Sequence, residues 1–139
     1  MNRLGLSDHD RRLLKQAEQA ASHAYAPYSR FRVGAAVQGR LAIYCGANVE
    51  NASFGLSLCA ERVALATAIA NGDRELSAVA LVCLDGDVAS GLGAFMPCGA
   101  CRQWLAELAP GAVLLVGYGD QVERFSVAQL LPDPFAISP

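Results

Sequence analysis

The chain has 139 residues, a formal net charge of −2 and a hydrophobic fraction of 53%. This length is typical of one domain, which can bury roughly two thirds of its unfolded surface around a core. An acidic chain without a block of Lys and Arg lacks the electrostatic footprint of a nucleic-acid-binding protein. It also has no stretch approaching the roughly 18 uncharged apolar residues of a membrane span. We therefore expect neither nucleic acid nor a membrane as a partner.

The five cysteines indicate where the protein works. The first residues lack the apolar region of a secretory signal. Cysteines in such a chain belong to a reducing compartment, where metal binding or catalysis is a more common use than disulfides. We therefore expect a cytoplasmic protein. The apolar composition further suggests that other copies of the chain cover part of the surface.

The first predicted helix has clear signals at both ends. Ser7 is a helix N-cap followed three residues later by the acid Asp10. Apolar residues then recur at helical spacing until about Tyr25, where Pro27 disfavours further helix. The expected helix therefore ends near Tyr25.

Periodicity and turn signals predict the remaining elements, in chain order: strands over 31–38 and 41–48, a helix over 59–70, a strand over 78–84, a helix over 99–108, strands over 112–117 and 122–125, and a last helical turn over 126–131. Gly39 and Arg40 alone separate the first two strands, which predicts a tight hairpin. Gly72 ends the second helix. The tail over 132–139 holds three prolines and is expected to be irregular.

This order of elements predicts an α/β fold. Strands that alternate with helices form a mixed sheet that helices cover on both faces. We therefore expect a single domain over 1–139, with flexible termini at about 1–6 and 136–139. The fold class is a three-layer α-β-α sandwich around a mixed five-stranded sheet.

Three cysteines occur in two short motifs, Cys59-Ala-Glu and Pro-Cys98-Gly-Ala-Cys101, each at the expected start of a helix. Helix N-termini present free N–H groups and positive potential, which favour the thiolate form that binds metal. Three protein ligands and one open position are typical of a catalytic zinc. His9 and His23 have no metal-like spacing, and no fourth ligand motif is visible. Cys98 and Cys101 alone would also suit a redox pair or a structural zinc knuckle.

Two charged residues, Glu61 and Arg62, come two and three positions after Cys59. Glu61 could take a proton from a metal-bound water, or it could be a first-turn acid that interacts with the helix dipole. Three thiolates around Zn²⁺ leave a formal charge of −1, which makes bound water harder to ionise. Arg62 and Arg102 are the cations available to offset that charge, and a guanidinium can donate hydrogen bonds to ligand sulfurs.

At this point the motifs together resemble a known family, the short homotetrameric zinc-dependent cytidine deaminases. Its signature is His or Cys, any residue, Glu, and later Pro-Cys-x-x-Cys, with the Glu not a ligand. The resemblance covers about residues 24–135 and rests on these segments: 26–29, 31–36, 48–53, 59–62, 97–103 and 130–132. It implies hydrolysis of cytidine and 2'-deoxycytidine to the uridines and ammonia, in pyrimidine salvage. It also implies one Zn²⁺ per chain and a homotetramer with sites shared between subunits.

The resemblance also implies a role for each matching residue. Cys59, Cys98 and Cys101 hold the zinc, and Glu61 carries protons between the water, ring N3 and the departing amine. The other implied roles are these: Asn48 and Glu50 bind the ribose 3'-hydroxyl, Phe31 lies against the pyrimidine, the Ala60 N–H contacts O2, Arg62 donates to the thiolates, and Phe135 enters a neighbouring subunit's site.

Several of these residues have plain structural alternatives. Asn48 and Glu50 could be loop residues, and Phe31 could be a core residue of its strand. Arg62 could face solvent, and Phe135 could dock on its own domain. The chain also departs from the family pattern in two places: Phe54 replaces a common Tyr, and the first hairpin turn is short.

Competing functions lie within and outside the same chemistry. Within it are deaminases of another aminopyrimidine, such as blasticidin S, or of a nucleotide or nucleic acid. A carboxylate such as Glu50 disfavours a neighbouring 3'-phosphate, which argues against polymers. Outside it are a non-catalytic zinc domain, which would need no Glu61, and a redox protein with a cycling cysteine pair.

Overall fold

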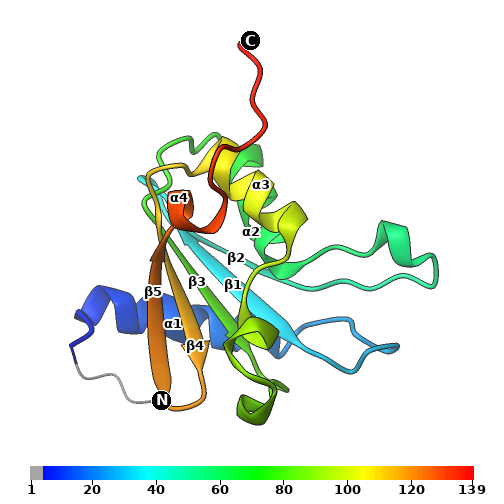
Figure 1. Cartoon of the computed structure of the whole chain (residues 1–139). Coiled ribbons are helices and arrows are strands. Elements are labelled where there is room, and N and C mark those ends of the chain that lie inside the picture. The colour runs from blue at the N-terminus through cyan, green and yellow to red at the C-terminus, as the bar shows by residue number, and fades with distance from the viewer. Residues whose placement is uncertain (1–4) are drawn as a thin grey trace.

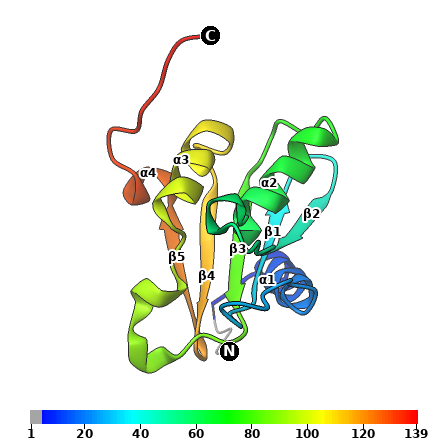
Figure 2. The same cartoon turned by 90° about the vertical axis from the view of Figure 1, so that its right-hand side faces the viewer.

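The computed structural model describes residues 5–139 and places a five-stranded sheet between two layers of helices (Figures 1 and 2). The longer elements are, in order: α1 (Asp8–Ala21), β1 (Val33–Gln38), β2 (Ile43–Ala47), α2 (Ala60–Ala70), β3 (Ala78–Cys83), α3 (Gly99–Leu108), β4 (Val113–Tyr118), β5 (Gln121–Ser126) and α4 (Val127–Leu130). Short 3₁₀ turns lie at Phe54–Leu56, Val88–Ser90 and Leu92–Phe95.

The sheet is mixed and has the order β2-β1-β3-β4-β5. The β3–β4 pair is parallel and the other neighbours are antiparallel. Helix α1 covers one face, where Leu13, Leu14 and Ala17 pack on Ala36 and Ala80. Helices α2, α3 and α4 cover the other face and its larger core (Figure 2). The predicted three-layer α/β fold is confirmed.

Two glycines let helices approach the sheet closely from opposite sides. A Cβ on Gly34 would lie 1.9 Å from the Ala17 carbonyl oxygen of α1. A Cβ on Gly46 would lie 2.5 Å from the Ala64 nitrogen of α2. Both distances are far below van der Waals contact, so only glycine permits this packing. Because α2 begins with the site motif, the contact at Gly46 also sets the position of the site.

Helix α1 ends four residues earlier than the sequence predicts. The Ser7–Asp10 capping box starts it as expected. At its other end, three-residue-spaced hydrogen bonds close the last turn, including Ala24 N–H to the Ala21 carbonyl at 3.2 Å. Tyr25 then pairs with the chain after β2: its N–H donates to the Asn48 carbonyl at 3.0 Å. This pairing with a distant segment draws Tyr25 out of the helix.

The β1–β2 turn is longer than predicted. The register pairs Gln38 with Ile43, which leaves a four-residue loop over 39–42 in place of the expected two-residue turn. Asp73 holds this loop: its carboxylate accepts from the N–H groups of Arg40 (3.2 Å) and Leu41 (2.8 Å). The buried side chain of a residue far along the sequence therefore determines the turn.

Helix α2 ends at Ala70, and Gly72 follows as the predicted glycine stop, with φ of +82°. The Gly72 N–H donates to the Ile69 carbonyl and the Asp73 N–H to the Ala68 carbonyl, at 3.0 and 3.1 Å. This pair of bonds is a Schellman motif, which favours glycine at the left-handed position. It directs the chain so that Asp73 meets the hairpin loop.

Two segments extend beyond the sheet on the same side of the molecule, around 25–31 and 50–58 (Figure 1). The C-terminal tail leaves the body at the top of the view, beyond α3 and α4 (Figure 1). The predicted flexible N-terminus falls, for residues 1–4, outside the described part of the chain. Over residues 5–139, no helix combines the length and apolar character needed to cross a bilayer.

Candidate active site

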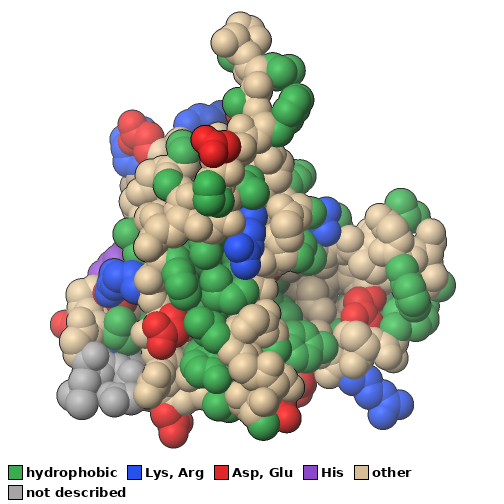
Figure 3. Space-filling model, viewed as in Figure 1, with side chains coloured by type: hydrophobic (Ala, Val, Ile, Leu, Met, Phe, Trp, Pro, Cys, Tyr) green, Lys and Arg blue, Asp and Glu red, His purple; other side chains and the backbone are tan. Residues whose placement is uncertain are grey.

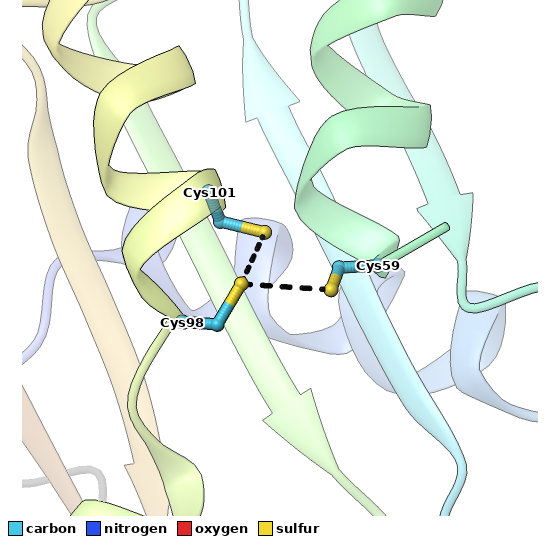
Figure 4. Close-up of side chains that lie close together, drawn as sticks. All are labelled: Cys59, Cys98 and Cys101. Atoms are coloured by element: carbon cyan, nitrogen blue, oxygen red, sulfur yellow. Dashed lines mark hydrogen bonds between the residues drawn. The ribbon is translucent and has the colours of Figure 1, made fainter. Parts of the chain in front are cut away.

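The three predicted metal-binding cysteines meet where two helices begin. Cys59 is the N-cap of α2, Cys98 is the N-cap of α3, and Cys101 lies in the first turn of α3 (Figure 4). The Cys98 sulfur is 3.8 Å from that of Cys59 and 3.5 Å from that of Cys101. All three sulfurs lie within 4.8 Å of one another. Two helix N-termini therefore direct their positive ends at one cluster of thiols.

The spacing of the sulfurs fits a zinc ion. Tetrahedral ligation with Zn–S bonds of about 2.3 Å separates sulfurs by about 3.8 Å. The observed 3.5 and 3.8 Å match this spacing. Among the described residues this is the one cluster of three side chains suited to a metal, and it offers three ligands. A tetrahedral ion held here keeps one position for water or substrate.

The local charges favour a thiolate at Cys59. A hydrogen bond from Cys101, and then contacts with Arg62, lower the pKa of the Cys59 thiol to about 5. The same hydrogen bond raises the pKa of the Cys101 thiol, which therefore keeps its proton and donates it to the Cys59 sulfur. A metal ion would displace that proton, since only deprotonated sulfur ligates.

Glu61 lies in the first turn of α2 and is almost completely buried, with 3% of its surface exposed. Burial is the main cause that raises the pKa of its carboxyl, and the Cys59 thiolate adds to it. A carboxyl whose pKa lies nearer neutrality exchanges protons more readily at neutral pH. This environment suits a general acid–base and differs from that of a first-turn acid in solvent.

A cavity of about 320 Å³ joins most of the predicted site residues. Cys59, Ala60, Glu61 and Cys98 line one part of it, and Phe31, Asn48 and Glu50 also line it. The volume is at the lower end of the range for small-molecule sites. Residues from β1, the chain after β2, α2, β3 and the chain before α3 thus surround one space.

Asn48 is held by two hydrogen bonds to the start of β1. Its Nδ2 donates to the Phe31 carbonyl and its Oδ1 accepts from the Val33 N–H, both at 2.8 Å. An amide group has a second N–H and a second lone pair. These two bonds to the backbone therefore use half of the hydrogen-bonding capacity of the Asn48 amide.

Glu50 is held by the loop before Phe31. It accepts from the N–H groups of Tyr28 (3.0 Å) and Ser29 (3.1 Å) and from the Ser29 hydroxyl. These bonds, the Ser29 hydroxyl first, lower the pKa of the Glu50 carboxyl. Glu50 is therefore a carboxylate near neutral pH and disfavours a phosphate beside it.

Arg62 lies beside the cluster and does not face solvent freely. Its Nη2 is 3.6 Å from the Cys59 sulfur and 3.4 Å from the Ser57 carbonyl. Its Nε is buried and has no hydrogen-bond partner among the described residues. The guanidinium thus places positive charge next to the thiolate, in the position expected for an arginine that offsets the charge of three thiolates.

Phe135 is not brought to the cavity of its own chain. It lies on the C-terminal tail with 75% of its surface exposed, and its carbonyl accepts from Gln103 Nε2 at 2.9 Å. Arg102 also contacts no cluster sulfur: it donates to the Pro97 and Leu130 carbonyls at 2.9 and 3.0 Å. Arg102 therefore links the chain before α3 to the end of α4 by hydrogen bonds.

The cavity also contains residues that the sequence did not single out for the site. Ser29, Phe95 and Met96 line it, and so does Cys83, whose burial raises the pKa of its thiol to about 12. Cys83 is not part of the cluster of three sulfurs. Cys45 is exposed on the edge strand β2, and its thiol donates to Gln16 Oε1 of α1 at 3.6 Å.

Comparisons with known proteins agree on one family. The family model for the "Cytidine and deoxycytidylate deaminase zinc-binding region" matches residues 7–116. A cytidine deaminase of Halalkalibacterium halodurans is 45% identical over 126 residues, which cover 88% of this chain and 91% of that protein. A cytidine deaminase of Mycobacterium tuberculosis H37Rv is 42% identical over 136 residues, or 95% and 94% of the two chains.

Solved structures give the same result. The crystal structure of cytidine deaminase from Burkholderia pseudomallei has a TM-score of 0.81 at 41% identity and covers 94% of this chain and 100% of that one. The cytidine deaminase from M. tuberculosis has a TM-score of 0.74 at 38% identity, with 94% and 99% covered. Sequence and fold therefore agree over nearly the whole chain.

Proposed function

This chain belongs to the cytidine and deoxycytidylate deaminase family, and on that basis we propose that it is a zinc-dependent hydrolase that converts cytidine and 2'-deoxycytidine to uridine and 2'-deoxyuridine with release of ammonia. One observation carries the proposal. A cluster of three thiols and the buried Glu61 adjoin a cavity that Asn48 and Glu50 also line.

Cys59, Cys98 and Cys101 would hold the zinc. Bound there, Zn²⁺ supplies a water of lowered pKa as the nucleophile near neutral pH. Arg62 supports the same chemistry because its charge lies 3.6 Å from the Cys59 sulfur. The two helix N-termini add positive potential of the same sign.

Glu61 moves the protons. It accepts a proton from the water that attacks C4 of the cytosine ring and donates it to ring N3. It then takes the second proton of that water, from the hydroxyl group now on C4, and passes it to the amino group, which leaves as ammonia as the C4 carbonyl forms. The reaction consumes one water, and the carboxylate of Glu61 returns to its starting state. Its burial and raised pKa support both the accepting and the donating step.

The remaining cavity residues would bind the nucleoside. The spare N–H and lone pair of Asn48 and the Glu50 carboxylate suit a ribose 3'-hydroxyl, which both donates and accepts. Phe31 would lie against the pyrimidine, and the N–H of Ala60, at the free start of α2, would contact O2. The negative charge of Glu50 favours a nucleoside over a nucleotide or polymer.

We infer a homotetramer with sites shared between subunits. Large apolar side chains are exposed on the two projecting segments, among them Tyr28, Phe54 and Leu56, and Figure 3 shows hydrophobic side chains on this projecting part. A second apolar region lies along α2 and α3, where Ile69, Trp104 and Leu108 line a groove of about 550 Å³. The exposed Phe135 would then enter a neighbouring subunit's site.

The cellular role follows from the reaction and the cysteines. All five cysteines are free, which supports a reducing, cytoplasmic location. Deamination of free nucleosides supports a role in pyrimidine salvage. We also propose that residues 1–139 form a single domain.

An absorbance assay of the purified protein with cytidine, beside cytosine, CMP and blasticidin S, tests the substrate class. We expect loss of the cytidine absorbance with release of ammonia and much slower reaction of CMP. No reaction with cytidine, in protein that holds about one zinc per chain, would leave another deaminase or a non-catalytic zinc domain. Cys98 and Cys101 that cycle to a disulfide would point to the redox alternative.

Glu61→Gln separates a deaminase from an inert zinc domain. The amide is similar in size but cannot carry protons, so we expect kcat to fall by at least about 100-fold while zinc content is unchanged. Zinc analysis and turnover on the same sample make the measurement. Wild-type turnover in Glu61→Gln would contradict the assigned role.

A further inference from the structure

An ion pair outside the cavity holds the backbone segment that carries Phe31. Arg32 Nε and Nη2 each donate to one carboxylate oxygen of Asp85, both at 2.9 Å. The Arg32 backbone N–H donates to the same carboxylate, also at 2.9 Å. Asp85 therefore receives three hydrogen bonds from one residue and fixes both its side chain and its backbone.

The Asn48 side chain binds the opposite edge of the same backbone segment, residues 31–33. Along an extended strand, successive residues direct their N–H and C=O groups to opposite edges. The Phe31 carbonyl and Val33 N–H face Asn48, at 2.8 Å each. Arg32 faces the other way: its carbonyl accepts from the Leu84 N–H at 3.0 Å and its N–H meets Asp85. Residues 31–33 therefore lie between Asn48 and Asp85.

We propose that Arg32 and Asp85 are positioning residues that orient the Asn48 amide for the nucleoside. This inference rests on the proposed function of the site. Both hydrogen bonds that orient Asn48 go to the backbone of residues flanking Arg32. Displacement of that backbone rotates the amide and moves its spare donor and acceptor. The ion pair itself contacts no residue of the thiol cluster.

Because the Arg32–Asp85 pair is partly exposed, it should contribute little to the stability of the fold. The side chains of Arg32 and Asp85 are 46% and 29% exposed, and ion pairs in that setting contribute little to stability. The two-pronged geometry instead gives a fixed direction. Fixing residues 31–33 relative to β3 is the effect that this geometry provides.

Three variants and a control test the proposal by kinetics. Arg32→Gln should raise KM for cytidine roughly three- to tenfold, with kcat nearly unchanged, because binding of the sugar weakens while the proton chemistry stays intact. Asp85→Ala should raise KM further because it also removes the acceptor of the Arg32 N–H. Arg32→Lys should restore part of the effect. Arg40→Gln, which removes the exposed Arg40–Glu75 pair at 2.9 Å, should leave KM unchanged.

A measurement on the ligand-free protein separates this inference from the proposed function. The side-chain amide signal of Asn48 in a ¹⁵N spectrum can be identified by its loss in Asn48→Asp. It should shift in Asp85→Ala and Arg32→Gln but not in Arg40→Gln. An unmoved amide signal, or a fall in kcat at constant KM, would overturn the positioning role. Failure of the wild type to deaminate cytidine would overturn only the proposed function.

Discussion

Arg62 places a positive charge beside the thiol cluster. Its guanidinium lies 3.6 Å from the Cys59 sulfur, and its Nε is buried without a partner among the described residues. A buried donor without a partner is costly. The cost is consistent with a side chain that is kept for its charge and not for its contribution to stability.

Replacing Arg62 should therefore impair the reaction more than metal binding. In Arg62→Gln we expect zinc to be retained and kcat to fall about 10- to 100-fold, as for other groups that support metal ligands. Arg62→Lys, which keeps the charge, should retain more activity. Zinc analysis and steady-state kinetics make the measurement, and unchanged turnover would remove this account of the charge balance.

At the residue scale, the sequence predicts contacts that depend on short spacing. Cys98 and Cys101 share one helical turn, and Glu61 is two residues from Cys59, so their proximity follows from helix geometry. The bond between Ser29 and Glu50 joins residues 21 apart, which meet because the β1–β2 hairpin folds back between them. The same holds for Arg32 and Asp85, 53 apart, which meet only because β1 pairs with β3.

The buried Asp73 organises an element far from it in sequence. It is 2% exposed and accepts from the N–H groups of Arg40, Leu41 and Glu75 and from the Tyr44 hydroxyl at 3.1 Å. These bonds hold the 39–42 loop and the chain after α2 together. No local pattern marks Asp73, and for this reason the sequence predicted a two-residue turn from Gly39 and Arg40 alone.

Removing Asp73 should destabilise the fold and leave the chemistry intact. For Asp73→Ala we expect a loss of about 2–4 kcal/mol in the free energy of unfolding, because the buried Tyr44 hydroxyl and three part-buried N–H groups lose their acceptor. Asp87→Ala is the matched control: Asp87 is exposed and accepts only from the Ala89 N–H at 3.0 Å. Denaturant unfolding makes the measurement. A similar small loss in both variants would contradict the role assigned to Asp73.

Elements with strong periodicity were predicted well, and those whose ends depend on tertiary pairing were not. The buried run at Ala78–Cys83 and the helix at Gly99–Leu108 agree closely with expectation. The predicted end of α1 was wrong because Tyr25 pairs with Asn48 and Glu50 instead of continuing the helix. Pairing of this kind overrides local propensity.

At the scale of the whole molecule, the projecting segments expose an apolar surface that a single chain leaves uncovered. Phe54 and Leu56 are 74% and 68% exposed, and Tyr28 meets the Phe54 ring edge-on at 5.9 Å between centroids. Since these segments also include Glu50 and flank the cavity, the proposed assembly would affect the shape of the site. The Phe54 ring has no hydroxyl, so any contact that it makes with another subunit is apolar.

A charge on this surface should weaken assembly. We expect Phe54→Glu to produce smaller species in sedimentation experiments and to lower kcat/KM for cytidine, because a carboxylate is costly to bury in an apolar interface. Leu41→Glu is the control: Leu41 is 58% exposed but lies in the hairpin loop near Asp73, away from the projecting segments. Equal assembly of the two variants would place the interface elsewhere.

The two glycines of the hairpin strands, Gly34 and Gly46, also affect how the strands align during folding. Gly34 pairs with Ala47 and Gly46 with Ala35, and each glycine leaves room for a helix on a different face of the sheet. A slip of one residue reverses the face of every side chain in a strand. In β1 or β2 such a slip would set an alanine methyl against the backbone of α1 or α2. The absence of a side chain at Gly34 and Gly46 therefore favours one strand register, because only that register allows both helices to pack on the sheet.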